Sequence, residues 1–341
     1  MFYIETSGTW REMGQQFGET FSDPLRACID HYCPWLLAES DRYASAVQSV
    51  REALQAHCPE LLEETEGIAE AAGLDPDVTI GYCFFNDVRA RMVEGCSVVY
   101  LAESDTGPLL GRNCDLRPTF DPEVQMCRIR KPRDGCATIM TTFLGLAAGL
   151  GLNEYGLGTA GASAHTKERY GDAGLPGQIL GFMLLHRCRN VKEARALFSE
   201  HLFLGKSHNM MVGDAGGASV LFEMAPGRTA VQVDRSDGTD WQVCTNFFVS
   251  GEIPIRPEPE YLESAYARYG RAVHRLGSGF VERSVSGLQG LLTELAQPGC
   301  CVTSKDGRSK TAYSQVMEMS SGQMYYAPGH PAELAWKVAS L

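Results

Sequence analysis

The predicted secondary structure changes at residues 94–96, from helices in the N-terminal part to short strands in the rest of the chain. Residues 10–93 carry apolar side chains at three- and four-residue spacings, which predicts helices, the last from 76 to about 92. Beyond residue 95, short β-rich runs alternate with turn residues such as the DTG at 105–107, which predicts hairpins. Further helices are expected at 177–188, 191–201, 259–275 and 285–296, with a final hairpin at 311–327. Hairpins with helices before, between and after them predict an α+β fold of two stacked antiparallel sheets covered by helices.

Composition narrows the class of protein. The 341 residues are 44% hydrophobic and 21% charged, which is the balance of a globular protein. A net charge of −12 argues against nucleic acid or an anionic membrane surface as the main partner. No apolar run approaches the roughly 18 residues that a membrane span needs. The first residues lack the basic and apolar regions of a signal peptide, so we expect a cytoplasmic protein without a membrane partner.

Twelve cysteines are scattered through apolar stretches. They form no C-x-x-C and no zinc-finger spacing with histidine, and the eight histidines form no H-x-x-x-H, so we expect no metal site. The glycine clusters lack the strand-turn-helix setting of a dinucleotide fingerprint, and no cofactor is predicted. Most of the thiols are therefore expected to be small buried hydrophobic groups.

Cys96 differs from the other cysteines in its position. It follows Gly95 at the start of the first predicted strand, and Arg112 and Asp115 come after it. This layout suits an N-terminal nucleophile, whose thiol attacks the carbonyl of the preceding small residue. Hydrolysis of the resulting ester frees an α-amine with an ordinary pKa of about 7.7–8, which can accept the thiol proton. On the dipeptide alone, a strand start with a buried thiol is the more common explanation of Cys96, because Gly-Cys is a common pair.

Motifs along the whole chain carry a family resemblance. The run EGCSVVYLAESDTGPLLGRNCDL resembles the opening of the mature chain in the acyl-coenzyme A:6-aminopenicillanic-acid acyltransferase family. Those are autoprocessing N-terminal nucleophile hydrolases related to choloylglycine hydrolase and penicillin V acylase. Upstream GTWREMGQQFGE and CPELLEETEGIAEAAG, and downstream GLNEYGL, CTNFF and ARYGRA, resemble further family motifs in the expected order. The resemblance implies a four-layer αββα sandwich, with a helical pro-segment of residues 1–95 and a catalytic segment of residues 96–341.

The resemblance also implies roles for residues near the start of the catalytic segment. Cys96 would be the nucleophile and, through its freed amine, the base. Asp115 resembles the carboxylate that orients this amine and favours its protonated state. Arg112 resembles the arginine of the choloylglycine branch that favours the thiolate, whereas Cys114 stands where the penicillin-type branch often has an aromatic residue.

Three further residues match family motifs downstream. Asn153 in GLNEYGL and Asn246 in CTNFF resemble asparagines that line the oxyanion hole, a task that suits neutral amide donors. Arg268 in ARYGRA resembles a second arginine of the active site, and an exposed arginine on a helix is the alternative. His208 and Glu223 also match family positions, and we expect structural roles for both.

The reaction implied is acyl transfer after self-cleavage between Gly95 and Cys96. The partners would be a small-molecule acyl donor, either an amide or a thioester of coenzyme A or a carrier protein, and an amine or water as acceptor. One alternative is a choloylglycine or penicillin V acylase-type hydrolase of N-acyl amides with no coenzyme A step. Another is a non-catalytic binding module of the same fold. The sequence leaves open the acyl group, the acceptor and whether the chain forms a homo-oligomer.

Overall fold

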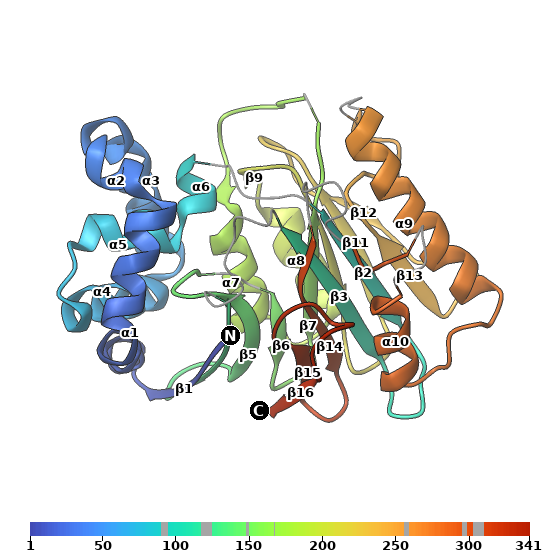
Figure 1. Cartoon of the computed structure of the whole chain (residues 1–341). Helices are drawn as coiled ribbons and strands as arrows, with labels where there is room; N and C mark the ends of the chain where they lie inside the picture. Colours follow the sequence, from blue (N-terminus) through green and yellow to red (C-terminus); the bar gives the residue numbers. More distant parts are fainter. Residues whose placement is uncertain are drawn as a thin grey trace.

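Two large sheets lie between layers of helices (Figure 1). The computed structural model of the chain describes residues 1–89, 95–116, 125–147, 150–166, 168–255, 259–294, 299–302 and 310–341. The helices are α1 (Trp10–Tyr32), α2 (Pro34–Ala38), α3 (Ser40–His57), α4 (Pro59–Ala72), α5 (Pro76–Cys83), α6 (Phe85–Arg89), α7 (Gly177–Arg187), α8 (Val191–Glu200), α9 (Pro259–Gly277) and α10 (Val285–Leu292).

The larger sheet has eight strands in the spatial order β1 (Phe2–Gly8), β4 (Gln125–Pro132), β5 (Thr138–Phe143), β6 (Gly151–Asn153), β7 (Gly158–Ser163), β10 (His208–Gly213), β11 (Ser219–Met224) and β12 (Val231–Val233). The smaller sheet has six, in the order β13 (Trp241–Cys244), β2 (Gly95–Leu101), β3 (Leu109–Leu116), β14 (Lys310–Glu318), β15 (Gln323–Ala327) and β16 (Lys337–Ser340). A short pair, β8 (Leu175–Pro176) and β9 (Phe203–Leu204), stands apart.

Local signals in the sequence explain several helix ends. Thr9 and Glu12 form a capping box at the start of α1, and the Asp75 side chain caps α5. Gly73 ends α4 with φ at 61°, a left-handed conformation that favours glycine. The ends predicted for two helices, near 92 and at 296, lie outside the described residues.

Three buried cores separate the layers. One lies between the two sheets and includes Val98 and Tyr100 of β2 with Ile139 of β5. A second joins α1, α4, α7 and α8 to the outer face of the eight-stranded sheet, and a third joins α9 and α10 to the six-stranded sheet. The order helix, sheet, sheet, helix confirms the predicted αββα sandwich. No helix of the described ranges is long and apolar enough to cross a bilayer.

Both predicted hairpins are present, as β2–β3 and β14–β15. The sequence did not predict β1, which pairs in parallel with β4 at the edge of the eight-stranded sheet. In this way the first residues of the chain complete a sheet built from residues beyond 124.

A buried ion cluster also joins the N-terminal helices to that sheet. Oε1 of Glu64 in α4 lies 2.5 Å from Nη2 of Arg128 and 2.9 Å from Nε of Arg130, both in β4. All three side chains are about 2% exposed. Burial alone would raise the pKa of Glu64, but the two guanidinium groups outweigh burial and lower it. The carboxylate is therefore charged and balances two cations that have no access to water.

We expect Glu64→Gln to destabilise the protein by about 3–5 kcal/mol, because it leaves two buried guanidinium groups without a counter-charge. Urea unfolding measures the effect. Glu5→Gln is the matched control, since Glu5 pairs with Lys131 at an exposed site and should cost about 0–1 kcal/mol. Equal effects of the two substitutions would show that the buried cluster contributes little.

Candidate active site

The pairing of β2 with β3 positions Cys96. In this antiparallel pair Cys96 lies opposite Cys114, and Gly95 lies opposite Asp115. Because side chains alternate along a strand, Cys96, Cys114 and Arg112 share the face toward the eight-stranded sheet. Asp115 has the opposite orientation, on the side where α9 packs.

The Cys96 thiol lies in a buried, positively charged environment. Its Sγ accepts a hydrogen bond of 3.3 Å from Nη2 of Arg112, and the residue is 4% exposed. A hydrogen bond from the Cys114 thiol and the charge of Arg112 lower the pKa of Cys96 to about 6, although burial acts in the opposite direction. Cys96 is therefore a thiolate near neutral pH, which is the nucleophilic form of a cysteine.

Arg112 is fixed by two other contacts. Its Nε donates to the carbonyl of Gly161 in β7 at 2.8 Å, and its Nη1 donates to the hydroxyl of Tyr313 in β14 at 2.6 Å. The guanidinium carbon also lies 5.4 Å from the centre of the Tyr313 ring. These contacts hold one guanidinium nitrogen against the sulfur.

Asn246 and Arg268 lie at the backbone of Cys96. Oδ1 of Asn246 accepts from the amide nitrogen of Cys96 at 2.9 Å and from Nη2 of Arg268 at 2.7 Å. Nη1 of Arg268 donates to the carbonyl of Cys96 at 2.5 Å and to the hydroxyl of Ser97 at 2.9 Å. Arg268 is 4% exposed, so the alternative of an exposed arginine is wrong.

Asp115 packs against the residue before Cys96. A Cβ atom added to Gly95 would lie 2.9 Å from Oδ2 of Asp115, so only glycine fits there without a shift. Oδ1 of Asp115 accepts from the Thr311 hydroxyl at 2.6 Å, and Oδ2 lies 3.8 Å from Nη1 of Arg268. Oδ2 is buried and has no hydrogen-bond donor among the described residues. Burial raises the pKa of Asp115 despite the two nearby arginines.

The structure does not bring Asn153 to this cluster. Its Nδ2 donates to the carbonyls of Leu185 and Cys188 at the end of α7, and its Oδ1 accepts from the amides of Tyr155 and Leu157. The side chain therefore joins the β6–β7 turn to α7, and it does not line the cavity beside Cys96. This arrangement corrects the oxyanion-hole role expected from the GLNEYGL motif.

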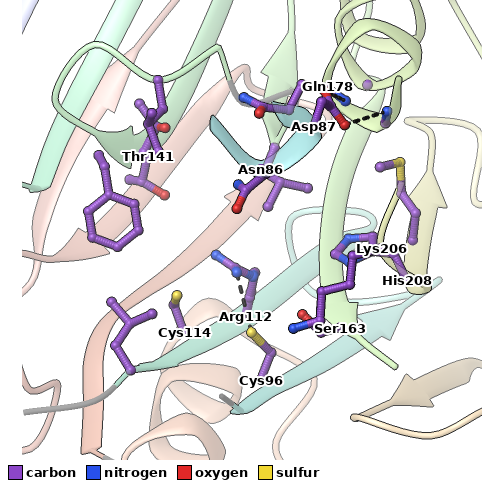
Figure 2. Close-up of a pocket in the computed structure, with 18 of the residues that line it drawn as sticks. Asn86, Asp87, Cys96, Arg112, Cys114, Thr141, Ser163, Gln178, Lys206 and His208 are labelled. Atoms are coloured by element: carbon purple, nitrogen blue, oxygen red, sulfur yellow. Dashed lines mark hydrogen bonds between the residues drawn. The ribbon is translucent and has the colours of Figure 1, made fainter. Parts of the chain in front are cut away.

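A cavity of about 190 Å³ opens above the thiol (Figure 2). Figure 2 shows Cys96, Cys114 and Arg112 at one end and Asn86, Asp87 and Gln178 at the other. The walls between them are mainly apolar and come from both sheets and their connections: Leu116, Phe143, Leu146, Leu150, Phe203, Met210 and Met224. The cavity can therefore enclose an apolar group whose reacting carbon lies at Cys96.

Several lining residues were not predicted as part of a site. Asp87 of α6 accepts from the amides of Gly177 and Gln178 at the start of α7, and burial raises its pKa to about 7. His208 of β10 lies against Gly161, and burial lowers its pKa to about 3, so its ring is neutral. Asp87 precedes Cys96 by nine residues and carries no motif that would mark it, whereas His208 matches a family position for which only a structural role was expected.

Glu223, for which a structural role was expected, and Asn209, the neighbour of His208, both contact the segment around Asn246. The Asn209 amide donates to the carbonyls of Thr245 and Phe247, on both sides of Asn246. The Glu223 carboxylate accepts from the backbone amides of residues 249 and 250. No three His, Cys, Asp or Glu side chains of the described ranges come together as a metal ion would require.

The fold is thus a helix-covered double sheet with a cavity that contains one thiolate cysteine. The chain belongs to the acyl-coenzyme A:6-aminopenicillanic acid acyl-transferase family, whose profile matches residues 101–333. This match confirms the resemblance found in the motifs. It also places the chain in a family of acyltransferases.

Solved structures give more distant matches. Two variants of conjugated bile acid hydrolase from Clostridium perfringens are 15% identical, with TM-scores of 0.48 and 0.46, and the match covers 72% of this chain and 97% of theirs. Penicillin V acylase from Agrobacterium tumefaciens is 14% identical with a TM-score of 0.42, over 68% of this chain and 82% of that one. The comparison with curated proteins gave no match.

We expect iodoacetamide to alkylate Cys96 with an inflection near pH 6, because Cys114 and Arg112 stabilise the thiolate. Cys114→Ala and Arg112→Gln each remove one stabilising group, so both should move the inflection to higher pH. Alkylation rates at Cys96, followed by peptide mass spectrometry across the pH range, measure the shift. Cys127→Ala is the control and should leave the inflection in place; an unchanged inflection in both test variants would contradict the assignment.

Proposed function

We propose that the chain is a cysteine N-terminal nucleophile enzyme, which cleaves itself between Gly95 and Cys96 and then transfers acyl groups through Cys96. The observation that carries the proposal is the contact between the Cys96 thiol and Arg112 at the end of an enclosed cavity. Family membership supplies the reaction class, and the contact supplies a nucleophile.

In the first step, the thiolate of Cys96 attacks the carbonyl carbon of Gly95. The peptide C–N bond breaks, the nitrogen takes up a proton, and a thioester joins Gly95 to the sulfur. Water then hydrolyses the thioester and frees Cys96 with an α-amine. The unpaired Oδ2 of Asp115 supports this step, because it lies beside Gly95 as an acceptor for a new N–H group.

The freed amine would then act as the base of each turnover. Asn246 lies beside the nitrogen of Cys96 and Asp115 lies opposite the preceding Gly95, so we expect the two to hold the ammonium form, since one presents an amide oxygen and the other a carboxylate. The amine takes a proton from the thiol, or from the attacking water or amine, and holds it within reach of the leaving group.

Acyl transfer would proceed through a tetrahedral oxyanion. Nδ2 of Asn246 donates one N–H to the carbonyl of Ser163 at 2.8 Å, which leaves its second N–H for the oxyanion. Attack on an amide or a thioester releases the amine or the thiol and leaves the acyl group on Cys96. Water or an amine then takes the acyl group, so the acceptor alone separates hydrolase from transferase.

The apolar cavity walls favour an acyl group without charge along its length. Assays should therefore offer apolar acyl chains both as N-acyl amides and as coenzyme A thioesters. Turnover of amides alone would identify the hydrolase of N-acyl amides considered from the sequence.

We also propose that residues 1–95 and 96–341 stay together after cleavage. The β1–β4 pairing and the Glu64 cluster both cross from one segment to the other, and neither involves the peptide bond that breaks. Asn86 and Asp87 of the first segment line the cavity, so the site would include both chains.

Cys96→Ala should remain a single chain of 37.3 kDa and should not turn over any acyl donor, because both reactions need the thiol. Intact mass spectrometry of the purified, reduced protein, with sequencing of any new N-terminus, measures the cleavage. Cys127→Ala, which alters a buried thiol outside the cavity, should be cleaved like the unaltered chain. Cleavage or activity in the Cys96→Ala protein would refute the proposal.

Gly95→Ala should slow self-cleavage, because its Cβ would press against Asp115 and displace the carbonyl that the thiol attacks. The rate is the fraction of cleaved chain over time, read by mass spectrometry. Gly270→Ala in α9 is the control, since an added Cβ there meets no atom within 4 Å. If the two variants were cleaved equally fast, the fit between Gly95 and Asp115 would not matter for the reaction.

A further inference from the structure

Two thiols, rather than one, face the cavity. Cys96 and Cys114 are the cysteines among its described lining residues, and they lie directly opposite each other in β2 and β3. We propose that Cys96 and Cys114 form a reversible disulfide when the protein meets a hydroperoxide, with Cys96 as the thiol that is oxidised and Cys114 as the thiol that resolves it.

The strand register supplies the geometry. Directly opposite residues of an antiparallel pair have Cα atoms about 4.5 to 5.5 Å apart, within the roughly 4.4 to 6.8 Å range that disulfides span. Their side chains point to the same face of the sheet, and both contribute to the core between the sheets. Figure 2 shows both sulfur atoms on the cavity side, next to the guanidinium of Arg112. The bond can therefore form with little movement of the backbone.

The two thiols differ in charge, as the reaction requires. Arg112 and the S–H of Cys114 stabilise the thiolate of Cys96, whereas that hydrogen bond and burial raise the pKa of Cys114 well above its usual range. Cys96 is thus the thiolate that attacks a peroxide, and Cys114 waits as a neutral thiol. Hydrogen peroxide is little larger than water, so the cavity of about 190 Å³ that both thiols line has room for it.

The chemistry balances in two steps. The Cys96 thiolate attacks one oxygen of the hydroperoxide and breaks the O–O bond, which gives a sulfenic acid and an alkoxide or hydroxide that takes up a proton. The sulfur of Cys114 then attacks the sulfur of Cys96, forms the S–S bond and releases the hydroxyl group as water, with its own proton passing to that water. Two thiols are oxidised and one peroxide is reduced.

Oxidation of Cys96 itself prepares Cys114 for the second step. As a thiolate, Cys96 raises the pKa of Cys114 by repulsion, and a neutral sulfenic acid exerts no such repulsion. The charge of Arg112 and a hydrogen bond with Tyr313 both lower the pKa of Cys114, and these influences remain. The thiolate character thus passes from one sulfur to the other within the same site.

The other buried cysteines do not combine a stabilised thiolate with a place in the cavity lining. Burial raises the pKa of Cys83, Cys127 and Cys300 to about 12, and none of the three lines the cavity. They are therefore thiols of low reactivity, and they serve as internal controls.

The disulfide would inactivate the enzyme and, at the same time, protect the sulfur of Cys96 from further oxidation. Sulfur bonded to Cys114 cannot attack a carbonyl, and it is also not available for oxidation to sulfinic acid, which is irreversible. A dithiol reductant would restore both thiols. The inference does not depend on cleavage at Gly95, because the two thiols face the same cavity in the uncleaved chain.

The test treats the reduced full chain with hydrogen peroxide, blocks remaining thiols with N-ethylmaleimide and maps the tryptic peptides. Trypsin cuts after Arg112, so a disulfide from Cys96 to Cys114 joins two separate peptides. We expect this linked pair, its disappearance after dithiothreitol, and loss of iodoacetamide labelling at Cys96 that the reductant reverses. The same spectra show whether the chain is cleaved after Gly95, so a failure of the proposed self-cleavage is detected independently of the disulfide.

Variants of Cys114 test whether its thiol reacts with the sulfenic acid of Cys96 or is only a neighbour of it. In Cys114→Ala and Cys114→Ser, peroxide should add oxygen to Cys96 up to the sulfinic acid, and dithiothreitol should not recover labelling. Cys127→Ala shares the tryptic peptide of Cys114 and should give the same linked pair as the unaltered chain. Sulfinic acid at Cys96 in the unaltered chain, at the rate found for Cys114→Ala, would overturn the proposal. So would a disulfide from Cys96 to any other cysteine.

Discussion

The register between β2 and β3 decides what surrounds Cys96. Because side chains alternate in direction, Arg112 and Cys114 face the cavity with the thiol, while Asp115 lies opposite Gly95 and toward α9. A shift of one residue would exchange the two faces and remove the cation from the sulfur. The turn at 105–107 helps to fix this register, so the conformation of a local turn affects the electrostatics at Cys96, nine residues before it in the sequence.

Two arginines act on Cys96 from opposite sides of the sheet. Arg112 contacts the sulfur from within the sandwich, and Arg268 reaches the carbonyl from α9 on the outer layer. Each is buried and each has further acceptors, so their positions are set by the fold rather than by the substrate. The same contacts therefore stabilise the fold and hold both charges at Cys96 in place. Electrostatic catalysis requires charges that are preorganised in this way.

Sequence reasoning predicted the layers, both hairpins, the family and the residues that lie close to Cys96 along β2 and β3. The hairpins and stacked sheets follow from strand alternation and turn residues, which are local signals, whereas the family and the residues around Cys96 came from the resemblance of the motifs. Asn153 was assigned from a motif, but its amide is occupied by four backbone groups that only the tertiary structure brings to it. His208 and Tyr313 reach the cavity from strands more than 100 residues beyond Cys96, and a motif match at His208 did not reveal that position. β1 was missed because its pairing depends on a distant strand.

That distant pairing has a consequence for how the chain folds. Thr6 of β1 donates to the carbonyl of Ile129 in β4, 123 residues further along. Helices α1 to α5 are neighbours in the sequence and can begin to form while the rest of the chain is still being made, but β1 and the Glu64 cluster must wait until β4 exists. The N-terminal part is therefore completed late, although it is synthesised first. Until then β4 presents its unpaired edge, and afterwards β1 takes its place as the edge strand of the sheet.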